Sequence, residues 1–413
     1  MNFSDFGNRF AGYSGITHLM DDLNEGLLQD DMIMMGGGNP AAIPEVIAAF
    51  EKVIDQLQAS GELVRALANY DGPQGKDTFI ETLAHFFQQH YGWNIDRRNI
   101  ALTHGSQSSF FTLFNAFAGK SRGGQQKILI PLVPEYIGYT DVGIEDSMIV
   151  SQEAKIQHLE EGFFKYQVDF ERLEVESNTG LICVSRPTNP SGNVLSDAEC
   201  RQLDRIARNN DVPLLVDNAY GTPFPSIIFN QVEPFWNENT IVCMSLSKLG
   251  LPGARTGIVI ANEEIIRLLS NMTAIASLAP GGIGPVIVRQ LIEDKLLLPL
   301  CHDVIMPFYQ KRSERAIRLI RDRIDDNRLH IHKTEGALFL WLWFEDLSIT
   351  SSELYERLKS KGLLVVPGKY FFPGQRLPTQ HAESCIRLNY VQNDEDLNKA
   401  VEILAQELKS CWA

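Results

Sequence analysis

Between residues 99 and 260, short apolar runs alternate with stretches of helical periodicity, a pattern typical of strands joined by crossover helices. Crossover connections make neighbouring strands parallel, so the pattern predicts an α/β fold with a mostly parallel central sheet flanked by helices. The apolar run 258–260 follows the run 240–244 after a loop short enough for the second strand to return antiparallel to the first. We therefore expect a mixed sheet. The predicted strands are 100–103, 127–130, 181–185, 212–216, 240–244 and 258–260.

The chain has 413 residues, of which 44% are hydrophobic, and this length suffices for two domains. The composition changes near residue 300, where an arginine-rich helix is followed by alternating strands and helices. We therefore predict a large domain over 46–300 and a smaller α+β domain built from 1–45 and 301–413. Helices are expected at 42–57, 78–91, 306–324, 352–359 and 394–408, and further strands at 335–343, 363–368 and 385–391.

The formal net charge of -15 leaves no basic surface for a phosphate backbone, which argues against nucleic acid as a partner. No apolar run approaches the length of a membrane span, and the first residues lack the charged and apolar regions of a signal peptide. The six cysteines are scattered without a C-x-x-C pair, which is typical of free thiols in a reducing compartment. We expect a cytoplasmic protein without membrane contacts and without a resident metal.

Lys248 follows the apolar strand 240–244 and lies in a Gly/Pro-rich segment that runs to Gly257. Lysine is seldom buried without a partner, and loss of hydration lowers the pKa of its ammonium group. A lysine at the end of such a strand can therefore be partly neutral near pH 7 and form a Schiff base. The alternative is a lysine whose stem packs on the strand end while its ammonium group stays in water.

Polar residues and glycines follow the carboxyl ends of several predicted strands, where ligands bind in α/β sheets. Asp217 ends an apolar strand, and a buried carboxylate is costly unless a cation such as a protonated ring nitrogen faces it. Gly105 and Ser106 open a helix and suit a phosphate, although Ser106 alone is also explained as an ordinary N-cap. The residues expected to converge on one crevice are Gly105, Ser106, Tyr136, Asn189, Asp217, Tyr220, Ser245 and Lys248.

Arg387 lies between Ile386 and Leu388 in a predicted strand, so its side chain points to the face opposite theirs. An arginine that faces the interior needs an anion, and a carboxylate offers the matching two-oxygen geometry. A structural salt bridge is the alternative to a bound substrate. The three glycines before Asn39 and Pro40 likewise allow close approach to a ligand or form an ordinary turn.

The order of these motifs resembles that of the class I/II, fold-type I, pyridoxal-phosphate-dependent aminotransferases, and the resemblance runs over essentially the whole chain. A nucleotide-binding α/β protein has less support, because no G-x-G-x-x-G follows an early strand and no Walker loop is present. The blocks that carry the resemblance are 14–17, 36–40, 69–76, 134–139, 245–253 and 277–285.

The resemblance implies a role for each matching residue, with the larger domain binding pyridoxal 5'-phosphate. Lys248 would hold it covalently as a Schiff base, the internal aldimine, and Asp217 would pair with the pyridine nitrogen. Tyr220 and Asn189 would donate to the phenolic oxygen, and Tyr136 would stack on the ring. The catalytic residues implied are Lys248, Asp217 and Tyr220. The implied phosphate ligands are Gly105, Ser106, Gln107, Ser245, Ser247 and Arg255, joined by Tyr70 from the other subunit of a homodimer.

For the substrate, the resemblance implies that Arg387 clamps the α-carboxylate beside Gly38 and Asn189. The other residues expected near the substrate are apolar, aromatic or small, namely Tyr13, Ile16, Phe339 and the loop 277–285. Because we find no second arginine for a side-chain carboxylate, aliphatic amino acids are favoured over aspartate and glutamate. The expected reaction is ping-pong transamination between valine, or a similar aliphatic amino acid, and pyruvate, giving 2-oxoisovalerate and alanine. A lyase or decarboxylase of the same fold, or a different amino-donor preference, is the alternative.

Overall fold

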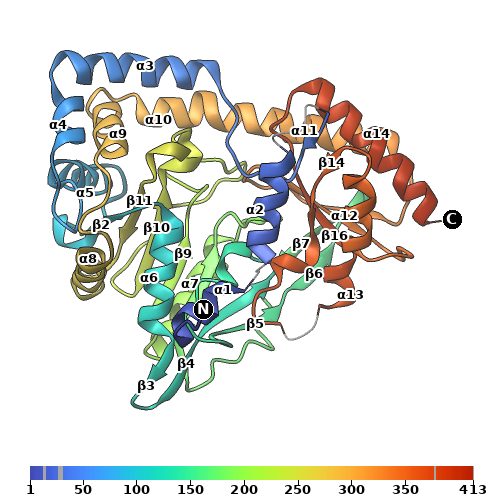
Figure 1. Cartoon of the computed structure of the whole chain (residues 1–413), viewed down its shortest axis with the longest axis horizontal. Coiled ribbons are helices and arrows are strands. Elements are labelled where there is room, and N and C mark those ends of the chain that lie inside the picture. Colours follow the sequence, from blue (N-terminus) through green and yellow to red (C-terminus); the bar gives the residue numbers. More distant parts are fainter. Residues whose placement is uncertain (13–14, 27–30, 376–377, 413) are drawn as a thin grey trace.

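The computed structural model describes residues 1–12, 15–26, 31–375 and 378–412 (Figure 1). Within these residues the strands form an eight-stranded, a six-stranded and a two-stranded sheet. The eight-stranded sheet is mixed and flanked by helices, which confirms the predicted α/β fold class. Its strands are β2 (Ile100–Thr103), β3 (Gly119–Ser121), β4 (Gly124–Val133), β5 (Ile149–Glu153), β8 (Thr179–Ser185), β9 (Leu214–Asp217), β10 (Thr240–Ser245) and β11 (Gly257–Ile260).

The order of this main sheet is β2-β11-β10-β9-β8-β4-β3, with β5 paired to β4. Strands β10, β9, β8, β4 and β5 are parallel, whereas β11 is antiparallel to both β10 and β2. The antiparallel return predicted for 258–260 is therefore confirmed. The register aligns the strand ends, because Ser185 and Cys243 both pair with Asp217, and Ser245 pairs with Gly257. Polar residues that lie far apart in the sequence thereby become neighbours.

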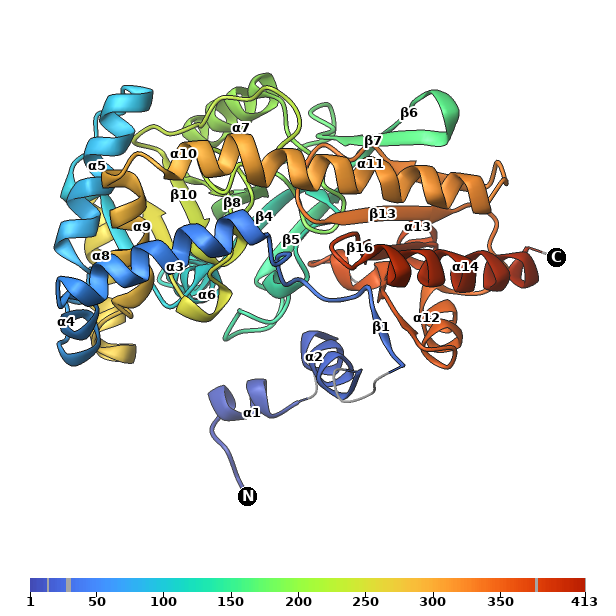
Figure 2. The same cartoon turned by 90° about the horizontal axis from the view of Figure 1, so that it is seen from above.

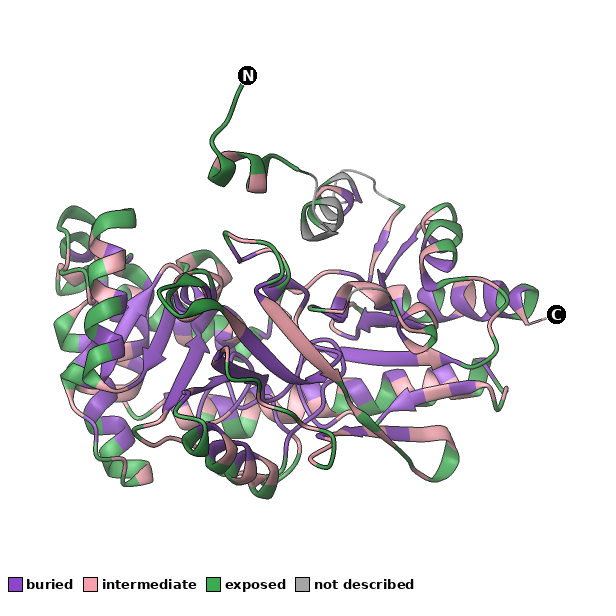
Figure 3. Cartoon of the chain, turned by 90° about the horizontal axis from the view of Figure 1, so that it is seen from below, coloured by how far each residue is buried: buried purple, intermediate pink, exposed green. Residues whose placement is uncertain are grey.

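Apolar residues alternate between the two faces of the main sheet, so each face has its own core. Ile241 and Val259 pack in one cluster, while Val242 and Ile258 pack in the other. Figure 3 shows these strands buried between helices whose outer faces are exposed. The helices of this part of the chain are α3 (Pro44–Ala59), α4 (Glu62–Ala68), α5 (Asp77–Tyr91), α6 (Ser106–Phe117), α7 (Asp197–Asn209), α8 (Glu263–Ser277), α9 (Ile283–Glu293) and α10 (Leu297–Pro299).

The six-stranded sheet has the order β15-β16-β13-β12-β7-β6 and lies beside the main sheet with the C-terminal helices around it (Figure 1). Strands β6 and β7 come from the middle of the chain, and β7 pairs in parallel with β12. The domain boundaries set at 46 and 300 stay a prediction. The elements are β6 (Lys155–His158), β7 (Phe163–Gln167), α11 (Met306–Arg323), β12 (Leu329–His332), β13 (Phe339–Phe344), α12 (Ser351–Lys359), β15 (Val366–Pro367), α13 (Gln380–Glu383), β16 (Cys385–Asn389) and α14 (Asp394–Cys411).

The N-terminal segment connects the two halves of the molecule. Helices α1 (Asp5–Ala11) and α2 (Gly15–Gly26) project from the body in Figure 2, and α1 has no buried residue. After them, β1 (Ile33–Met34) pairs in parallel with β14 (Leu363–Leu364), which ties this segment to the C-terminal third. No helix in the described ranges is both long and apolar enough to cross a membrane.

Candidate active site

A cavity of about 160 Å³ lies at the carboxyl ends of the main-sheet strands. Three separate parts of the chain line it: the loops after these strands, the N-terminal segment and strand β16. Several residues that the sequence analysis predicted to converge therefore do lie together. The lining residues are Met20, Gly36, Gly38, Ser106, Phe110, Tyr136, Ile137, Ser185, Pro187, Asn189, Asp217, Ala219, Tyr220, Lys248 and Arg387.

Lys248 lies in the 3-10 turn that follows β10, and its ammonium group faces the cavity. Its Nζ donates a hydrogen bond of 2.6 Å to the carbonyl oxygen of Gly38 and lies 5.3 Å from the centre of the Tyr220 ring. Burial lowers the pKa of Lys248 to about 8. The positive charges of Arg387 and Arg255 also lower this pKa, whereas the negative charge of Asp217 raises it. More of this amine is consequently unprotonated and nucleophilic near neutral pH than in an ordinary lysine.

Asp217, the last residue of β9, is a buried carboxyl group on the floor of the cavity. One carboxyl oxygen accepts a hydrogen bond of 2.8 Å from the hydroxyl of Tyr139, and the other accepts one of 3.1 Å from the backbone N–H of Ala219. Burial raises the pKa of Asp217 to about 6, although these hydrogen bonds and Lys248 oppose the shift. The group is therefore mostly ionised at pH 7 and suited to face a cation.

Three polar residues beneath Asp217 were not singled out from the sequence. The hydroxyl of Tyr139 also lies 3.1 Å from Ser185 Oγ, and Ser185 contacts Glu135 through both its backbone N–H and its hydroxyl. Glu135 is fully buried. A glutamate two residues after the end of an apolar strand was the available signal, because glutamate is rarely buried without a partner. The pairing of Ser185 with Asp217 required knowledge of the strand order.

Arg255 packs against the start of α6. Gly105 has a φ of 86°, and a Cβ atom at this position would lie 2.4 Å from Nη2 of Arg255. Glycine therefore allows the guanidinium to approach the first N–H groups of the helix. The hydrogen bonds of Arg255 go only to uncharged oxygens among the described residues, including Ser247 Oγ at 3.5 Å. Ser245 accepts a hydrogen bond of 3.2 Å from the backbone N–H of Ser247.

Arg387 lies on the opposite wall, where it is buried and forms no ion pair with a carboxylate of the described residues. Nη1 donates to Asn189 Oδ1 at 2.8 Å, and Nη2 donates to the carbonyl oxygen of Gly36 at 2.6 Å. The guanidinium carbon lies 4.1 Å from the centre of the Phe339 ring, while Nε has no hydrogen-bond partner among the described residues. Burial lowers the pKa of Arg387 to about 10. A buried cation with neutral partners and a free donor is suited to bind an incoming anion.

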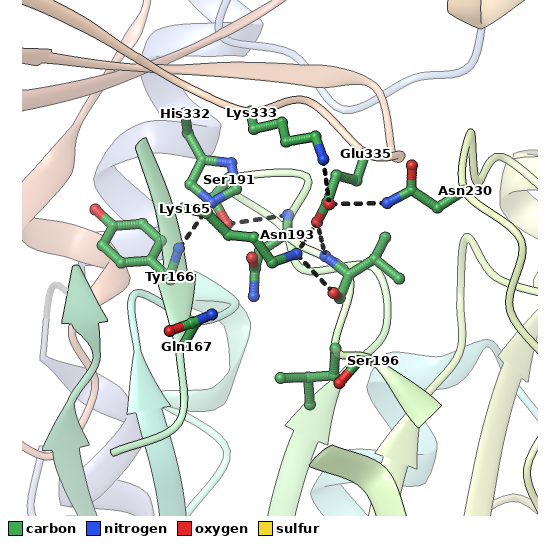
Figure 4. Close-up of polar contacts among 12 residues, drawn as sticks. Lys165, Tyr166, Gln167, Ser191, Asn193, Ser196, Asn230, His332, Lys333 and Glu335 are labelled. Carbon is green, nitrogen blue, oxygen red and sulfur yellow. Dashed lines mark hydrogen bonds and ion pairs between the residues drawn. The ribbon is translucent and has the colours of Figure 1, made fainter. Parts of the chain in front are cut away.

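The loop that carries Asn189 is held by Glu335, which is 3% exposed. Figure 4 shows that the Glu335 carboxylate forms ion pairs with Lys165 and Lys333 and accepts hydrogen bonds from Asn230 and the backbone N–H of residue 194. These contacts tie the loop to β7 and to the segment before β13. Glu335 therefore anchors the end of this loop from outside the cavity.

The remaining predicted residues lie in different environments. Gln107 donates to the Gly138 carbonyl oxygen at 3.0 Å, beside the loop of Tyr136. Phe339 is completely buried under Arg387 and is not among the residues that line the cavity. Tyr70 is 85% exposed at the surface. Tyr13 and the side chain of Ile16 lie outside the described residues. The assigned roles of these residues stay predictions.

The first testable consequence concerns the pKa of Lys248 in the cofactor-free protein. We expect the labelling of Lys248 by acetic anhydride, followed by peptide mass spectrometry, to rise with pH around a midpoint near 8. Arg387→Gln removes a neighbouring positive charge, so the midpoint moves upward. The control Arg318→Gln removes an exposed charge from α11 and leaves the midpoint unchanged. Equal midpoints in the wild type and Arg387→Gln would contradict this account.

Comparisons with known proteins agree with this geometry. A family model described as aminotransferase class I and II matches residues 31–404. The valine–pyruvate aminotransferase of Escherichia coli (strain K12) is 53% identical over 100% of this chain and 99% of its own. The solved valine-pyruvate aminotransferase of Salmonella typhimurium LT2 is 51% identical, with a TM-score of 0.90 over 96% of this chain and 99% of its own.

A more distant structure shows how widely the fold is shared. Aspartate aminotransferase from Thermus thermophilus superposes with a TM-score of 0.80 at 20% identity, covering 98% of this chain and 100% of its own. At this identity the likeness concerns the fold alone. The family model and the full-length relatives go further, since the model covers residues 31–404 and the Escherichia coli relative is 53% identical over the whole chain. The chain belongs to the class I and II aminotransferases.

Proposed function

We propose that this protein catalyses pyridoxal 5'-phosphate-dependent transamination between valine, or a similar aliphatic amino acid, and pyruvate. The observation that carries the proposal is the position of Lys248, Asp217 and Arg387 around one cavity. An amine of lowered pKa, a buried carboxylate and a buried guanidinium without an acidic partner are the groups that such a reaction requires. Full-length relatives named as valine–pyruvate aminotransferases support the choice of substrates.

The residues present fit pyridoxal phosphate. The N-terminus of α6 with Arg255 offers N–H donors and a positive charge for the phosphate group. Asp217 offers a carboxylate for a protonated pyridine nitrogen, and Lys248 offers an amine for the aldehyde. Tyr136 lines the same cavity and offers an aromatic face for the ring. When bound, the cofactor supplies an electron sink for the negative charge that develops at the substrate Cα.

The residues of the chain would orient the substrate and move its proton. Arg387 would bind the α-carboxylate through its guanidinium and so fix which bond of Cα is presented for cleavage. Lys248 Nζ would then take the Cα proton as a general base and return it as a general acid, which its lowered pKa favours. Asp217 would hold its negative charge in place throughout.

The apolar part of the lining supports an aliphatic substrate. Met20, Phe110 and Ile137 are among the lining residues, and Arg387 is the one arginine that lines the cavity in the described part of the chain. A side-chain carboxylate would enter this site without a dedicated cationic partner, which is costly. Valine and alanine carry no such group.

Removing the proposed anchoring amine tests the assignment directly. Lys248→Ala is expected to lower kcat by at least about a thousandfold, because one residue supplies both the covalent anchor and the general base. The visible absorbance of the covalently held cofactor should disappear in the same variant. The control Lys120→Ala changes a surface lysine and should alter neither quantity. Retention of both absorbance and turnover by Lys248→Ala would exclude the proposal.

The substrate assignment is tested by steady-state rates with pyruvate and a panel of amino donors. Valine and other aliphatic donors should give kcat/KM values at least about tenfold above those of aspartate and glutamate, because among the described residues no second arginine lines the cavity to bind a side-chain carboxylate. Release of 2-oxoisovalerate beyond one equivalent per site must depend on pyruvate, because pyruvate removes the amino group left behind by the first half-reaction. Multiple turnovers without an oxo acid would indicate a lyase or decarboxylase, and a preference for aspartate would exclude the substrate assignment.

We infer in addition that the protein acts as a homodimer in the cytoplasm. Exposed apolar side chains gather on α4, the loop after it and the end of α8: Val64, Leu67, Tyr70, Ile275 and Leu278. Helices α4 and α8 lie on the same side of the molecule in Figure 1. A patch of this kind marks a surface for association, and Tyr70 within it would reach the site of a second copy.

The six free, buried cysteines support a reducing compartment.

The proposed association is tested by sedimentation of a double variant. Leu67→Glu combined with Ile275→Glu places two charges in the patch and is expected to convert the dimer to monomers. The control Ile144→Glu changes an exposed isoleucine on another part of the surface and should leave the mass unchanged. A dimer that survives the double substitution would show that this patch is not the interface.

A further inference from the structure

Two buried carboxyl groups, Glu135 and Asp217, are connected by two hydroxyl groups. Oε2 of Glu135 lies 2.6 Å from Ser185 Oγ, which lies 3.1 Å from the hydroxyl of Tyr139, which lies 2.8 Å from Oδ2 of Asp217. All four residues are buried, with Glu135 fully inaccessible. They come from the loop after β4 and from the ends of β8 and β9, so the sheet register fixes the chain of contacts.

The number of hydrogen atoms available for these three contacts shows whether both carboxyl groups can be ionised. If both carboxyl groups were ionised, only the hydroxyls of Ser185 and Tyr139 would supply hydrogens for the three contacts. One buried pair of oxygens would then face each other without a hydrogen, which is costly. One additional proton on either carboxyl group gives every contact a hydrogen and directs all the hydrogen bonds the same way.

The surroundings decide which carboxyl group holds that proton. The other contacts of Glu135 are the neutral backbone N–H groups of Ser185 at 2.8 Å and Tyr136 at 3.1 Å. No lysine or arginine of the described residues forms an ion pair with Glu135, whereas Lys248 lies close enough to Asp217 to favour its ionised form. Burial raises the pKa of Glu135 to about 8, above that of Asp217. Both observations assign the proton to Glu135.

We propose that Glu135 is a neutral carboxylic acid that donates to Ser185 and, through Tyr139, holds the negative charge on Asp217. Glu135 is thus a positioning residue, since it touches neither substrate nor cofactor and acts through two hydroxyl groups. Each hydrogen bond in the chain then points toward Asp217 and stabilises its ionised form. The inference rests on the proposed function in one respect only, namely that the fixed charge of Asp217 would face the bound cofactor.

Infrared spectroscopy of the full-length, cofactor-free protein tests the protonation state without relying on activity. Protein labelled with carboxyl-¹³C glutamate should show at pH 7 an isotope-shifted C=O band of a protonated carboxylic acid. Glu135→Gln should remove this band. The matched control is Glu407→Gln, since Glu407 is buried but ion-paired with Arg357 and Lys361, which keep its pKa low. This control should leave the band unchanged.

The pH dependence adds a second measurement that needs no variant. The band should vanish as the pH rises through about 8, the pKa of Glu135. The titratable groups facing Glu135 are Asp217 from β9, Cys183 from β8, and Tyr136 and Tyr139 from its own loop. Burial, together with the negative charge of Asp217, opposes ionisation of Glu135, whereas the hydrogen bonds from Ser185 and from the backbone N–H of Tyr136 favour it.

The outcomes separate this inference from the proposed function. Absence of a protonated glutamate band at pH 7, or its persistence in Glu135→Gln, would overturn the proposal. The proposal would also be overturned if protein labelled on aspartate showed the band of a protonated carboxylic acid and Asp217→Asn removed that band. The proton would then be on Asp217. None of these spectra depends on valine, pyruvate or turnover. If Glu135→Gln does not fold, the labelled wild-type protein alone decides the result.

Discussion

The concentration of positive charge around a single buried carboxylate is the interaction on which the site depends. Lys248 and Arg387 line the cavity, Arg255 lies close enough to lower the pKa of Lys248, and Asp217 is the acidic residue among the described residues that line it. Burial lowers the pKa values of both Lys248 and Arg387, and the positive charges of Arg387 and Arg255 lower that of Lys248 further. An entering phosphate or carboxylate relieves this repulsion, so the unliganded arrangement favours binding of anions.

The fold supplies this arrangement by placing charged side chains at the ends of apolar strands. Within β9 and β10 every side chain is buried, and polarity begins at Asp217 and Ser245. Register then sets these ends side by side. A slip by one residue would turn every side chain of a strand toward the opposite core and disrupt the packing of both, so core packing also fixes the spacing of the polar groups.

The sequence predicted the elements with strong local patterns. Strands such as 100–103 and 240–244 and the helix over 78–91 were confirmed within a residue or two, and the converging loops followed from the general rule for α/β sheets. Contacts between distant segments were not visible in advance. Glu135 gained its partners only from the pairing of β4, β8 and β9, and the addition of β6 and β7 to the second sheet left no local signal. Helix α8 was also not recognised.

The pairing of β1 with β14 also bears on the order in which the site is assembled during synthesis. The carbonyl oxygens of Gly36 and Gly38 contact Arg387 and Lys248, 351 and 210 residues away in the sequence. The N-terminal segment emerges first from the ribosome, yet its partner strand and Arg387 are among the last parts made. Such distant contacts close late in folding. A complete cavity therefore signals that both ends of the chain have joined, and cofactor retention reports on completed folding.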